Sequence, residues 1–356
     1  MKIFILLPYG GGSHEYWAKS IAKISLHNIK IFQLPGRYWK WRMHGAASYF
    51  STFINEREEK PDLILTTSMM NIPEFRGQLN NEFKSIPIHL YFHENQFAYP
   101  VSKNDPDKNS ERLEHFQFIQ IQSFINADQV YFNSEYNQKT FLEGSRQLLK
   151  KLPDFKEHLT SGLERVSKIW KIHIDIDELE DVRGKKKPTN EIVFIWNHRW
   201  ENDKNPVGFF DLLRKIKQKG THFKLIICGK QTPNPIFSIA RKEFSEEIIH
   251  FGEVNSRQKY LELLSKATHS IITSFHDFYG ISALELLFSG VKTYFPKRLV
   301  YSEHFDVAAW DSVSYDLETI MDKIESSTYP SFESILSPLI FQNEEIKKQT
   351  RLYLST

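Results

Sequence analysis

The sequence predicts an α/β protein made of two doubly wound, Rossmann-like domains that face a central cleft. Two observations support this fold. Short, β-prone apolar runs alternate with amphipathic helical segments along the chain, and a length of 356 residues suits about two domains of ordinary size. Because ligands bind outside the carboxyl ends of parallel strands, we expect functional residues directly after the apolar runs.

In the N-terminal half, apolar β-prone runs predict strands, and amphipathic segments predict helices between them. The strands are expected at residues 2–9, 29–35, 62–68, 86–93 and 129–134. The helices include one from about Asn109 to Asn126 and another from Ser134 to Lys151. We assign residues 1–180 to this domain.

The apolar pattern stops after Ile176, where acidic and then basic residues follow, together with Gly184 and Pro188. This change predicts a linker at residues 181–190. A second series of β-prone runs places the nucleotide-binding domain at residues 191–335, with strands expected at 191–200, 223–230, 247–254, 269–275 and 291–296. Residues 336–356 are expected to form a C-terminal helix that packs back on the first domain.

The composition excludes several classes of protein. A hydrophobic content of 40% and a charged content of 25% are typical of globular proteins. The sequence has no apolar run of about eighteen residues and no signal-peptide pattern, so we expect a cytoplasmic protein without an integral membrane segment. The single cysteine, Cys228, excludes an internal disulfide. A net charge of +2 argues against broad electrostatic binding of nucleic acid but leaves room for a local basic patch.

The segment 271–290 combines a β-prone run, a polar turn and the start of a helix. The first backbone N–H groups of that helix, at residues 280–282, would face an anion. Asp277 and Glu285 flank this position and are spaced to hold hydroxyl groups on different parts of one ligand. The segment therefore predicts a site for a phosphate and a sugar. The alternative interpretation is an ordinary βα unit with two solvated carboxylates.

Arg199 and Lys204 follow the first β-prone run of the second domain. Arginine offers a planar, bidentate fork and lysine a compact charge, so the pair suits a diphosphate and the charge that grows as it departs. Two solvated cations before a helix are the alternative.

Three segments of the first domain carry candidate binding residues. Three glycines at residues 10–12 follow a strand and form a plausible anion or sugar loop, although they match neither a P-loop nor a dinucleotide fingerprint. Residues 93–96 deliver four polar side chains at a strand end, where His93 could bind a hydroxyl group or transfer a proton. Residues 37–42 alternate cations with aromatic rings, a pattern that suits unpaired bases or, alternatively, an amphipathic surface loop.

These motifs together resemble those of the family-4 retaining glycosyltransferases, which have the GT-B architecture, and more closely those of the tRNA-queuosine mannosyltransferase group. Arg199 and Lys204 match the general Arg-x4-Lys pair, and Asp277 and Glu285 match the Glu-x7-Glu motif. The closer resemblance lies between residues 8 and 305, in the segments PYGGGSH, RYWKWRMHGAA, YFHENQFAYPV, FNSEYN, NHRWENDKNP and LVYSEHF.

The resemblance implies transfer, with retention, of a hexose onto the queuosine of tRNA, with mannose from GDP-mannose as the expected donor and no metal or other cofactor. The catalytic residues would be His93, Arg199, Lys204 and Asp277. The donor would contact Gly11, Gly12, Arg199, Lys204, Asp277, Tyr279, Gly280, Ile281, Ser282 and Glu285. The acceptor would contact Ser13, His14, Arg37, Trp39, Trp41, Arg42, Glu94 and Asn95.

Asp277 stands where the family has a glutamate, and its side chain is one methylene shorter. This difference would alter the donor choice or the rate, or would fit a sugar-nucleotide or RNA-binding module that has lost transfer. A transferase of the same fold with a lipid or cell-surface glycan as acceptor is a second alternative. A metal-dependent transferase would need an Asp-x-Asp motif, which occurs at residues 105–107 and 175–177. An oxidoreductase is disfavoured because the dinucleotide fingerprint is absent.

Overall fold

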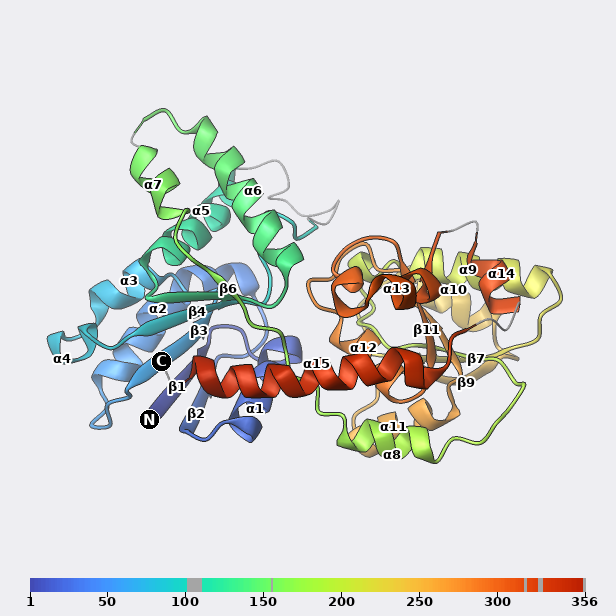
Figure 1. The fold of residues 1–356 in the computed structure, drawn as a ribbon. Helices are drawn as coiled ribbons and strands as arrows, with labels where there is room; N and C mark the ends of the chain where they lie inside the picture. Colours follow the sequence, from blue (N-terminus) through green and yellow to red (C-terminus); the bar gives the residue numbers. More distant parts are fainter. Residues whose placement is uncertain (101–110, 155, 317–318, 326–328, 355–356) are drawn as a thin grey trace. The chain divides into compact units, whose positions relative to one another are not determined.

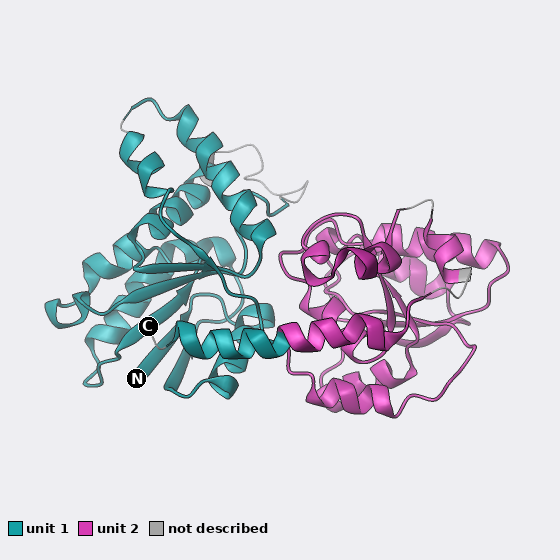
Figure 2. Cartoon of the chain, viewed as in Figure 1, with its two compact units in different colours: residues 1–173, 343–356 teal, residues 174–342 magenta. Residues whose placement is uncertain are grey.

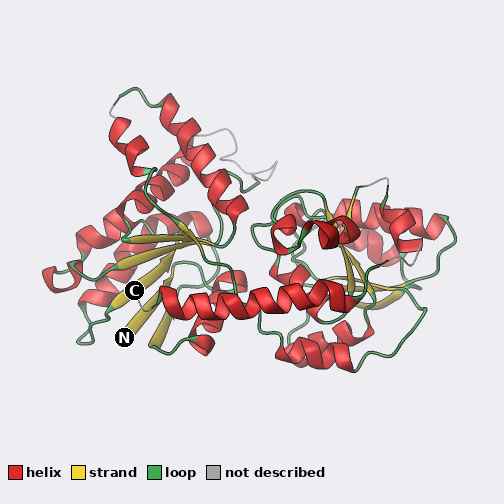
Figure 3. Ribbon diagram, viewed as in Figure 1, coloured by secondary structure: helices red, strands yellow, loops and turns green. Residues whose placement is uncertain are grey.

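The computed structural model describes residues 1–100, 111–154, 156–316, 319–325 and 329–354. The chain divides into two compact units, residues 1–173 with 343–356 and residues 174–342 (Figure 2). Each unit contains a six-stranded parallel sheet with helices on both faces (Figures 1 and 3). The predicted α/β fold with two doubly wound domains is therefore confirmed.

Unit 1 has the strand order β2-β1-β3-β4-β5-β6, so the direction of winding reverses between β1 and β3. Its strands are β1 (Lys2–Leu7), β2 (Asn28–Gln33), β3 (Leu63–Thr67), β4 (Ile88–Phe92), β5 (Gln129–Phe132) and β6 (Lys168–Ile169). Its helices are α1 (Gly12–Ile24), α2 (Trp39–Asn55), α3 (Ile72–Gln78), α4 (Asn81–Lys84), α5 (Glu111–Asn126), α6 (Glu135–Lys151) and α7 (Glu157–Gly162).

The central strands β3 and β4 of unit 1 are buried along their whole length because helices cover both faces of the sheet, whereas the edge strand β2 is partly exposed. Successive side chains of a strand point to opposite faces. On β4, Leu90 belongs to the core that also contains Phe50 of α2 and Phe75 of α3. The next residue, Tyr91, instead stacks on Trp17 of α1 at 4.3 Å between ring centroids.

The last helix, α15 (Phe332–Tyr353), begins in unit 2 and ends in unit 1. Its C-terminal half is held by side-chain hydrogen bonds. The indole Nε1 of Trp170 donates to Thr350 Oγ1 at 2.8 Å, and Arg351 donates to the carbonyl oxygen of Ile24 at 3.0 Å. The helix begins four residues before the predicted residue 336, and the chain returns to unit 1 at Asn343.

Unit 2 has the strand order β12-β11-β10-β7-β8-β9, in which β7 and β10 are neighbours at the point where the winding reverses. Its strands are β7 (Val193–Trp196), β8 (Lys224–Cys228), β9 (Ile248–Gly252), β10 (His269–Ile271), β11 (Lys292–Pro296) and β12 (Ser314–Tyr315). Its helices are α8 (Asp177–Gly184), η1 (Asn202–Lys204), α9 (Pro206–Gln218), α10 (Pro235–Glu243), α11 (Arg257–Lys266), α12 (Ile281–Phe288), η2 (Tyr301–His304), α13 (Val307–Val313) and α14 (Ile320–Glu325).

The predicted linker is wrong in position. The boundary between the units lies after His173, and the acidic stretch that suggested a linker forms α8 of unit 2. Its carboxylates stand in the first helical turn, where the helix dipole favours them. Leu179 is fully buried, and Arg183 donates to the carbonyl oxygen of Phe288 at 3.2 Å. Charge alone therefore misidentified a helix that packs through one apolar face.

Several predicted strands are too long, because their polar carboxyl ends are loops. The run 191–200, for example, is a strand only at Val193–Trp196. The two-residue strands β6 and β12 were missed because so short a segment has no periodicity. The start of the helix predicted from Asn109, and the Asp105–Asp107 motif, lie outside the described residues. Among the described helices, none has both the length and the apolar character that a membrane span requires.

Candidate active site

The predicted residues of unit 2 gather at the carboxyl ends of β7 and β10. Arg199 and Lys204 follow β7, and Asp277 follows β10. Since these two strands are neighbours at the switch point, loops that are distant in sequence meet there. The structure brings Lys204 and Asp277 into contact and places Glu285 in the adjoining helix α12.

Lys204 is the centre of an ion-pair cluster that is largely buried. Its Nζ lies 3.4 Å from a carboxylate oxygen of Asp277 and 3.4 Å from one of Asp203. The ammonium also donates to the carbonyl oxygen of His276 at 3.0 Å. One hydrogen bond and two ion pairs therefore hold the Lys204 ammonium in place.

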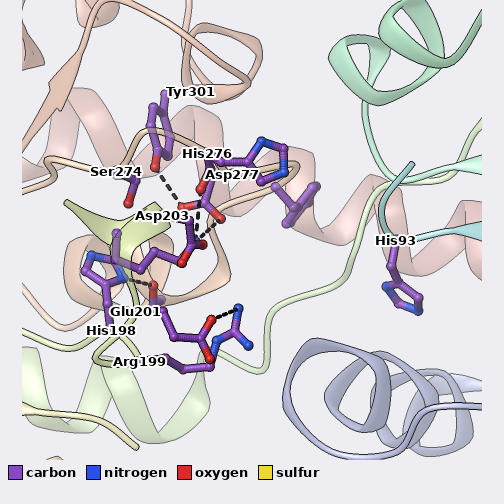
Figure 4. Close-up of polar contacts among 12 residues, drawn as sticks. His93, His198, Arg199, Glu201, Asp203, Ser274, His276, Asp277 and Tyr301 are labelled. Atoms are coloured by element: carbon purple, nitrogen blue, oxygen red, sulfur yellow. Dashed lines mark hydrogen bonds and ion pairs between the residues drawn. The ribbon is translucent and has the colours of Figure 1, made fainter. Parts of the chain in front are cut away.

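Asp277 is held on its other side by Tyr301, whose hydroxyl donates to Oδ2 at 2.8 Å (Figure 4). Burial alone would raise the pKa of Asp277, but the charge of Lys204, the neighbouring His198 and the Tyr301 hydrogen bond together keep that pKa below its ordinary value. Asp277 is therefore a carboxylate at neutral pH. Tyr301 was missed as a site residue, although it lies in the segment LVYSEHF that carries part of the family resemblance.

Arg199 is in a different environment from Lys204. Its side chain is 46% exposed, and Nη2 lies 3.2 Å from the carboxylate of Glu201. A half-exposed guanidinium can rotate toward an incoming anion at little energetic cost, because a surface ion pair contributes less than about 1 kcal/mol. Lys204 is thus preorganised, whereas Arg199 is accessible to ligand from solvent.

Glu285 is buried beside a cation and a phenol. Arg257 of α11 donates to Oε1 at 2.8 Å, and the Tyr260 hydroxyl lies 3.4 Å from Oε2. Burial raises the pKa of Glu285, and the charge and hydrogen bond of Arg257 partly oppose that rise. Asn197, directly after β7, donates to the Tyr260 hydroxyl at 2.7 Å. Arg257 and Tyr260 were not predicted, because no spacing rule links α11 to the helix that carries Glu285.

A cavity of about 150 Å³ opens next to these residues. It lies at the carboxyl ends of β7, β8 and β9 and is lined by Asn197, Cys228, Gly229, Lys230, Glu253, Val254 and Tyr260. Gly229 has a φ of 129°, and a Cβ atom there would lie 1.9 Å from the carbonyl oxygen of His198. Only glycine allows the loops after β7 and β8 to approach so closely.

Gly280 is in the left-handed region, with a φ of 84°, and precedes α12. A Cβ atom there would lie 2.9 Å from the ring of Tyr301, so this glycine leaves room for the residue that holds Asp277.

Ile281 and Ser282 form the first turn of α12, the helix start at which an anion was predicted to bind. The Ser282 hydroxyl lies 3.1 Å from Nδ1 of His198, whose pKa burial lowers to about 4. Tyr279 is buried, and its carbonyl oxygen contacts His304.

In unit 1, the glycine loop leads into α1, with positive φ angles of 88° at Gly11 and 55° at Gly12. Ser13 is exposed at the start of that helix, whereas His14 is buried. The ring of His14 lies 4.2 Å from that of His93, and Nε2 of His14 lies 3.7 Å from the carboxylate of Glu94. The loop after β1 and the loop after β4 therefore form one cluster.

This cluster contains buried ring nitrogens without hydrogen-bond partners among the described residues. Both nitrogens of His93 are unpaired in this sense, as are Nδ1 of His14 and the indole nitrogen of Trp17. Burial, followed by the proximity of His14, holds the pKa of His93 well below its ordinary value, so the ring is neutral. Since buried polar atoms are normally satisfied, these nitrogens mark a position where hydroxyl groups of a ligand can bind.

Two predicted acceptor residues make packing contacts within unit 1. Asn95 is fully buried; its amide donates to Asn137, and its side-chain oxygen accepts from the backbone of Phe97. Trp39 packs on Phe116 at 5.2 Å between ring centroids. Trp41, two residues further along, is 63% exposed, and Arg37 is exposed beside it. Arg42 is half-buried and donates to the carbonyl oxygen of Pro35 at 3.3 Å.

No group of three or more histidine, cysteine, aspartate or glutamate side chains that could hold a metal ion occurs in the part of the chain that the structure describes. The Asp175–Asp177 motif lies at the start of α8. The metal-free scheme remains a prediction.

Comparisons with solved structures match this architecture over almost the whole chain. Anabaena HepE, solved with UDP, aligns with a TM-score of 0.69 at 14% identity and full coverage of both chains. The sucrose-phosphate synthase of Thermosynechococcus elongatus aligns with a TM-score of 0.69 at 13% identity, covering 100% of this chain and 99% of that one. The UDP-forming trehalose-phosphate synthase of Burkholderia xenovorans gives 0.67 at 10% identity, covering 99% and 98%. The likeness shows a GT-B fold.

Two family models match the N-terminal and C-terminal parts of the chain separately. Residues 2–171 match the N-terminal domain of tRNA-queuosine alpha-mannosyltransferase, and residues 177–293 match group 1 glycosyl transferases. Fold and family together define the class of protein, a glycosyltransferase that transfers a hexose. The tRNA-queuosine alpha-mannosyltransferase of Drosophila melanogaster is 30% identical over 312 residues, which cover 85% of this chain and 81% of the relative. The chain belongs to the tRNA-queuosine alpha-mannosyltransferase family.

Proposed function

We propose that this protein transfers mannose from GDP-mannose onto the queuosine nucleoside of tRNA, with retention of the sugar's configuration. The match of residues 2–171 to the N-terminal domain of tRNA-queuosine alpha-mannosyltransferase carries this proposal, because that half of the chain distinguishes the family from other group 1 transferases. The tRNA acceptor would place the enzyme in the cytoplasm.

Unit 2 would hold the donor. Glu285, fixed by Arg257, would accept hydrogen bonds from the ribose hydroxyls, and the cavity beside Tyr260 would take the base. The diphosphate would lie at the N-terminus of α12, where Arg199 and Lys204 compensate its charge. As the glycosidic bond breaks, both electrons pass to a phosphate oxygen, and these cations stabilise the charge that develops there.

The acceptor hydroxyl would bond to the anomeric carbon on the face from which the diphosphate departs, and its proton would pass to the departing phosphate oxygen. Asp277 would contact the donor sugar as a carboxylate, near the carbon that becomes positive. In unit 1, His93 would orient a sugar or acceptor hydroxyl as a neutral ring. Gly11 and Gly12 would let the donor approach the loop before α1, and Ser13, His14 and Glu94 would contact the acceptor. No metal takes part in this scheme.

Asp277 depends on Tyr301 for its position, so the variant Tyr301→Phe is expected to lower kcat by about tenfold, the value of one hydrogen bond to a charged group. The phenylalanine ring still fits against Gly280. The matched control is Tyr315→Phe, which removes another buried hydroxyl, one that donates to the carbonyl oxygen of Ile272. Turnover at saturating substrates should fall only in the first variant, and equal losses of kcat in both would contradict the positioning role.

The assignment is tested by incubating the protein with queuosine-containing tRNA and, separately, GDP-mannose or another sugar nucleotide, and then analysing the digested RNA by mass spectrometry. We expect queuosine to gain one hexose with GDP-mannose. If queuosine gains a hexose only with a different sugar nucleotide, the assignment of the donor's sugar or base is wrong, but the acceptor assignment stands. Donor hydrolysis without any gain would move the acceptor to a lipid or glycan, and donor binding without turnover would indicate a module that has lost transfer.

A further inference from the structure

The Trp41 ring packs against a glycine of its own helix. In α2, a Cβ atom on Gly45 would lie 3.2 Å from two carbons of the Trp41 indole. The indole is nevertheless 63% exposed. The ring is therefore supported by the helix at Gly45, while most of the residue is open to solvent.

Gly45 is not required by the backbone conformation. It stands inside α2 with an ordinary helical φ, where glycine destabilises a helix by about 0.5–1 kcal/mol relative to alanine. Alanine would push against the indole at a separation tighter than ordinary van der Waals contact. The glycine is thus explained by the position of Trp41 and not by the helix.

A second exposed ring stands one helical turn before Trp41. Tyr38 is 72% exposed and has a φ of 58°, a left-handed conformation that is unfavourable for a bulky residue. Such strain concentrates at functional positions. The guanidinium of Arg37 lies over the Tyr38 ring at 5.7 Å, so a cation accompanies this aromatic surface.

The surrounding sequence is free of negative charge. Residues 16–55 contain six lysines and arginines and no aspartate or glutamate, although the whole chain has 44 acidic residues. Exposed aromatic rings accompanied by cations match the chemistry of single-stranded nucleic acid, in which bases stack and phosphates pair.

We propose that Trp41, supported by Gly45, and Tyr38 form a stacking platform for unpaired bases of an RNA acceptor. This proposal rests on the proposed function and names the part of unit 1 that would hold the RNA around the modified nucleoside. Trp39, between Tyr38 and Trp41 in sequence, packs on Phe116 of α5. Rigid aromatic faces suit bases of any sequence, so the platform supplies affinity for a loop of single-stranded RNA and not sequence specificity.

The test measures the dissociation constant of a fluorescent anticodon stem-loop RNA by anisotropy, and the KM for queuosine-containing tRNA where turnover is observed. Trp41→Ala and Tyr38→Ala are each expected to weaken RNA binding by about tenfold, the loss of one stacked base. The dissociation constant for GDP should not change. Trp41→Phe keeps an aromatic face and should lose less.

Gly45→Ala separates binding from folding. This variant should weaken RNA binding several-fold, because the indole is displaced, while the unfolding temperature stays the same or rises. Gly77→Ala in α3 is its control, since no described atom outside its own helix lies within 4 Å of the added carbon. Tyr49→Ala, which removes another exposed ring of α2, is the control for Trp41→Ala.

RNA affinity of Trp41→Ala and Gly45→Ala within twofold of their controls would overturn the platform. Loss of binding to anionic lipid vesicles, with RNA binding retained, would assign the surface to a membrane and also overturn it. A wild-type protein that binds the stem-loop without transferring a hexose would contradict the proposed function but would still test the platform through affinity.

Discussion

Replacing Arg199 with alanine is expected to lower kcat by about 10²–10³, the cost of losing one donor that stabilises a developing anion. The free energy of unfolding should change by less than about 1 kcal/mol, because a half-exposed side chain with one ion pair contributes little to stability. The measurements are turnover at saturating donor and acceptor, and urea unfolding. Arg199→Lys keeps the charge but loses the bidentate fork. Its turnover should therefore lie between those of the wild type and Arg199→Ala.

The matched control for this prediction is Arg214→Ala. Arg214 is bonded to Asp211 and Glu243, and both of these interactions raise its pKa. Its removal should cost more stability than the removal of Arg199 and should leave turnover unchanged. If Arg199→Ala turns over like the wild type, the diphosphate is not stabilised by this residue, and the assignment of the Arg-x4-Lys pair fails.

Replacing Glu285 with glutamine is expected to raise the KM for the donor by roughly tenfold to a hundredfold, since hydrogen bonds to a charged group contribute about 1.5–3 kcal/mol. Glutamine keeps the shape but loses the negative charge that faces Arg257. The effect should fall on the KM for the donor and not on the KM for tRNA. Glu262→Gln, on the exposed face of α11, is the matched control.

Glu285 also predicts a pH dependence. Because burial raises its pKa, this carboxylate takes up a proton at a higher pH than an ordinary glutamate does. As the pH falls, the acceptor for the ribose hydroxyls is lost, so the KM for the donor should rise on the acidic side. Glu285→Gln should lack this rise. A donor KM that responds to pH equally in both proteins would assign the titration to another group.

The polar residues after the strands were predictable because their signal is local. Asp277 follows a β-prone run, and parallel strands present their carboxyl ends at one edge of a sheet. The different environments of Trp39 and Trp41 could also have been predicted from the sequence. Two residues apart on a helix point in nearly opposite directions, so only one of the two rings can face solvent. The prediction of the linker was wrong because it relied on charge patterning, which does not reveal that one face of α8 is buried.

The sequence by itself determined two parallel α/β domains, the glycosyltransferase family and the positions of the Arg199–Lys204 and Asp277–Glu285 motifs. The domains follow from periodicity, and the family follows from the resemblance of short motifs to those of known members. Only the tertiary structure decided that Tyr301 holds Asp277, that Arg257 holds Glu285 and that Asn95 is a buried support. Those partners come from other loops and helices, and each contact depends on which elements become neighbours in space, a packing choice that no local pattern encodes.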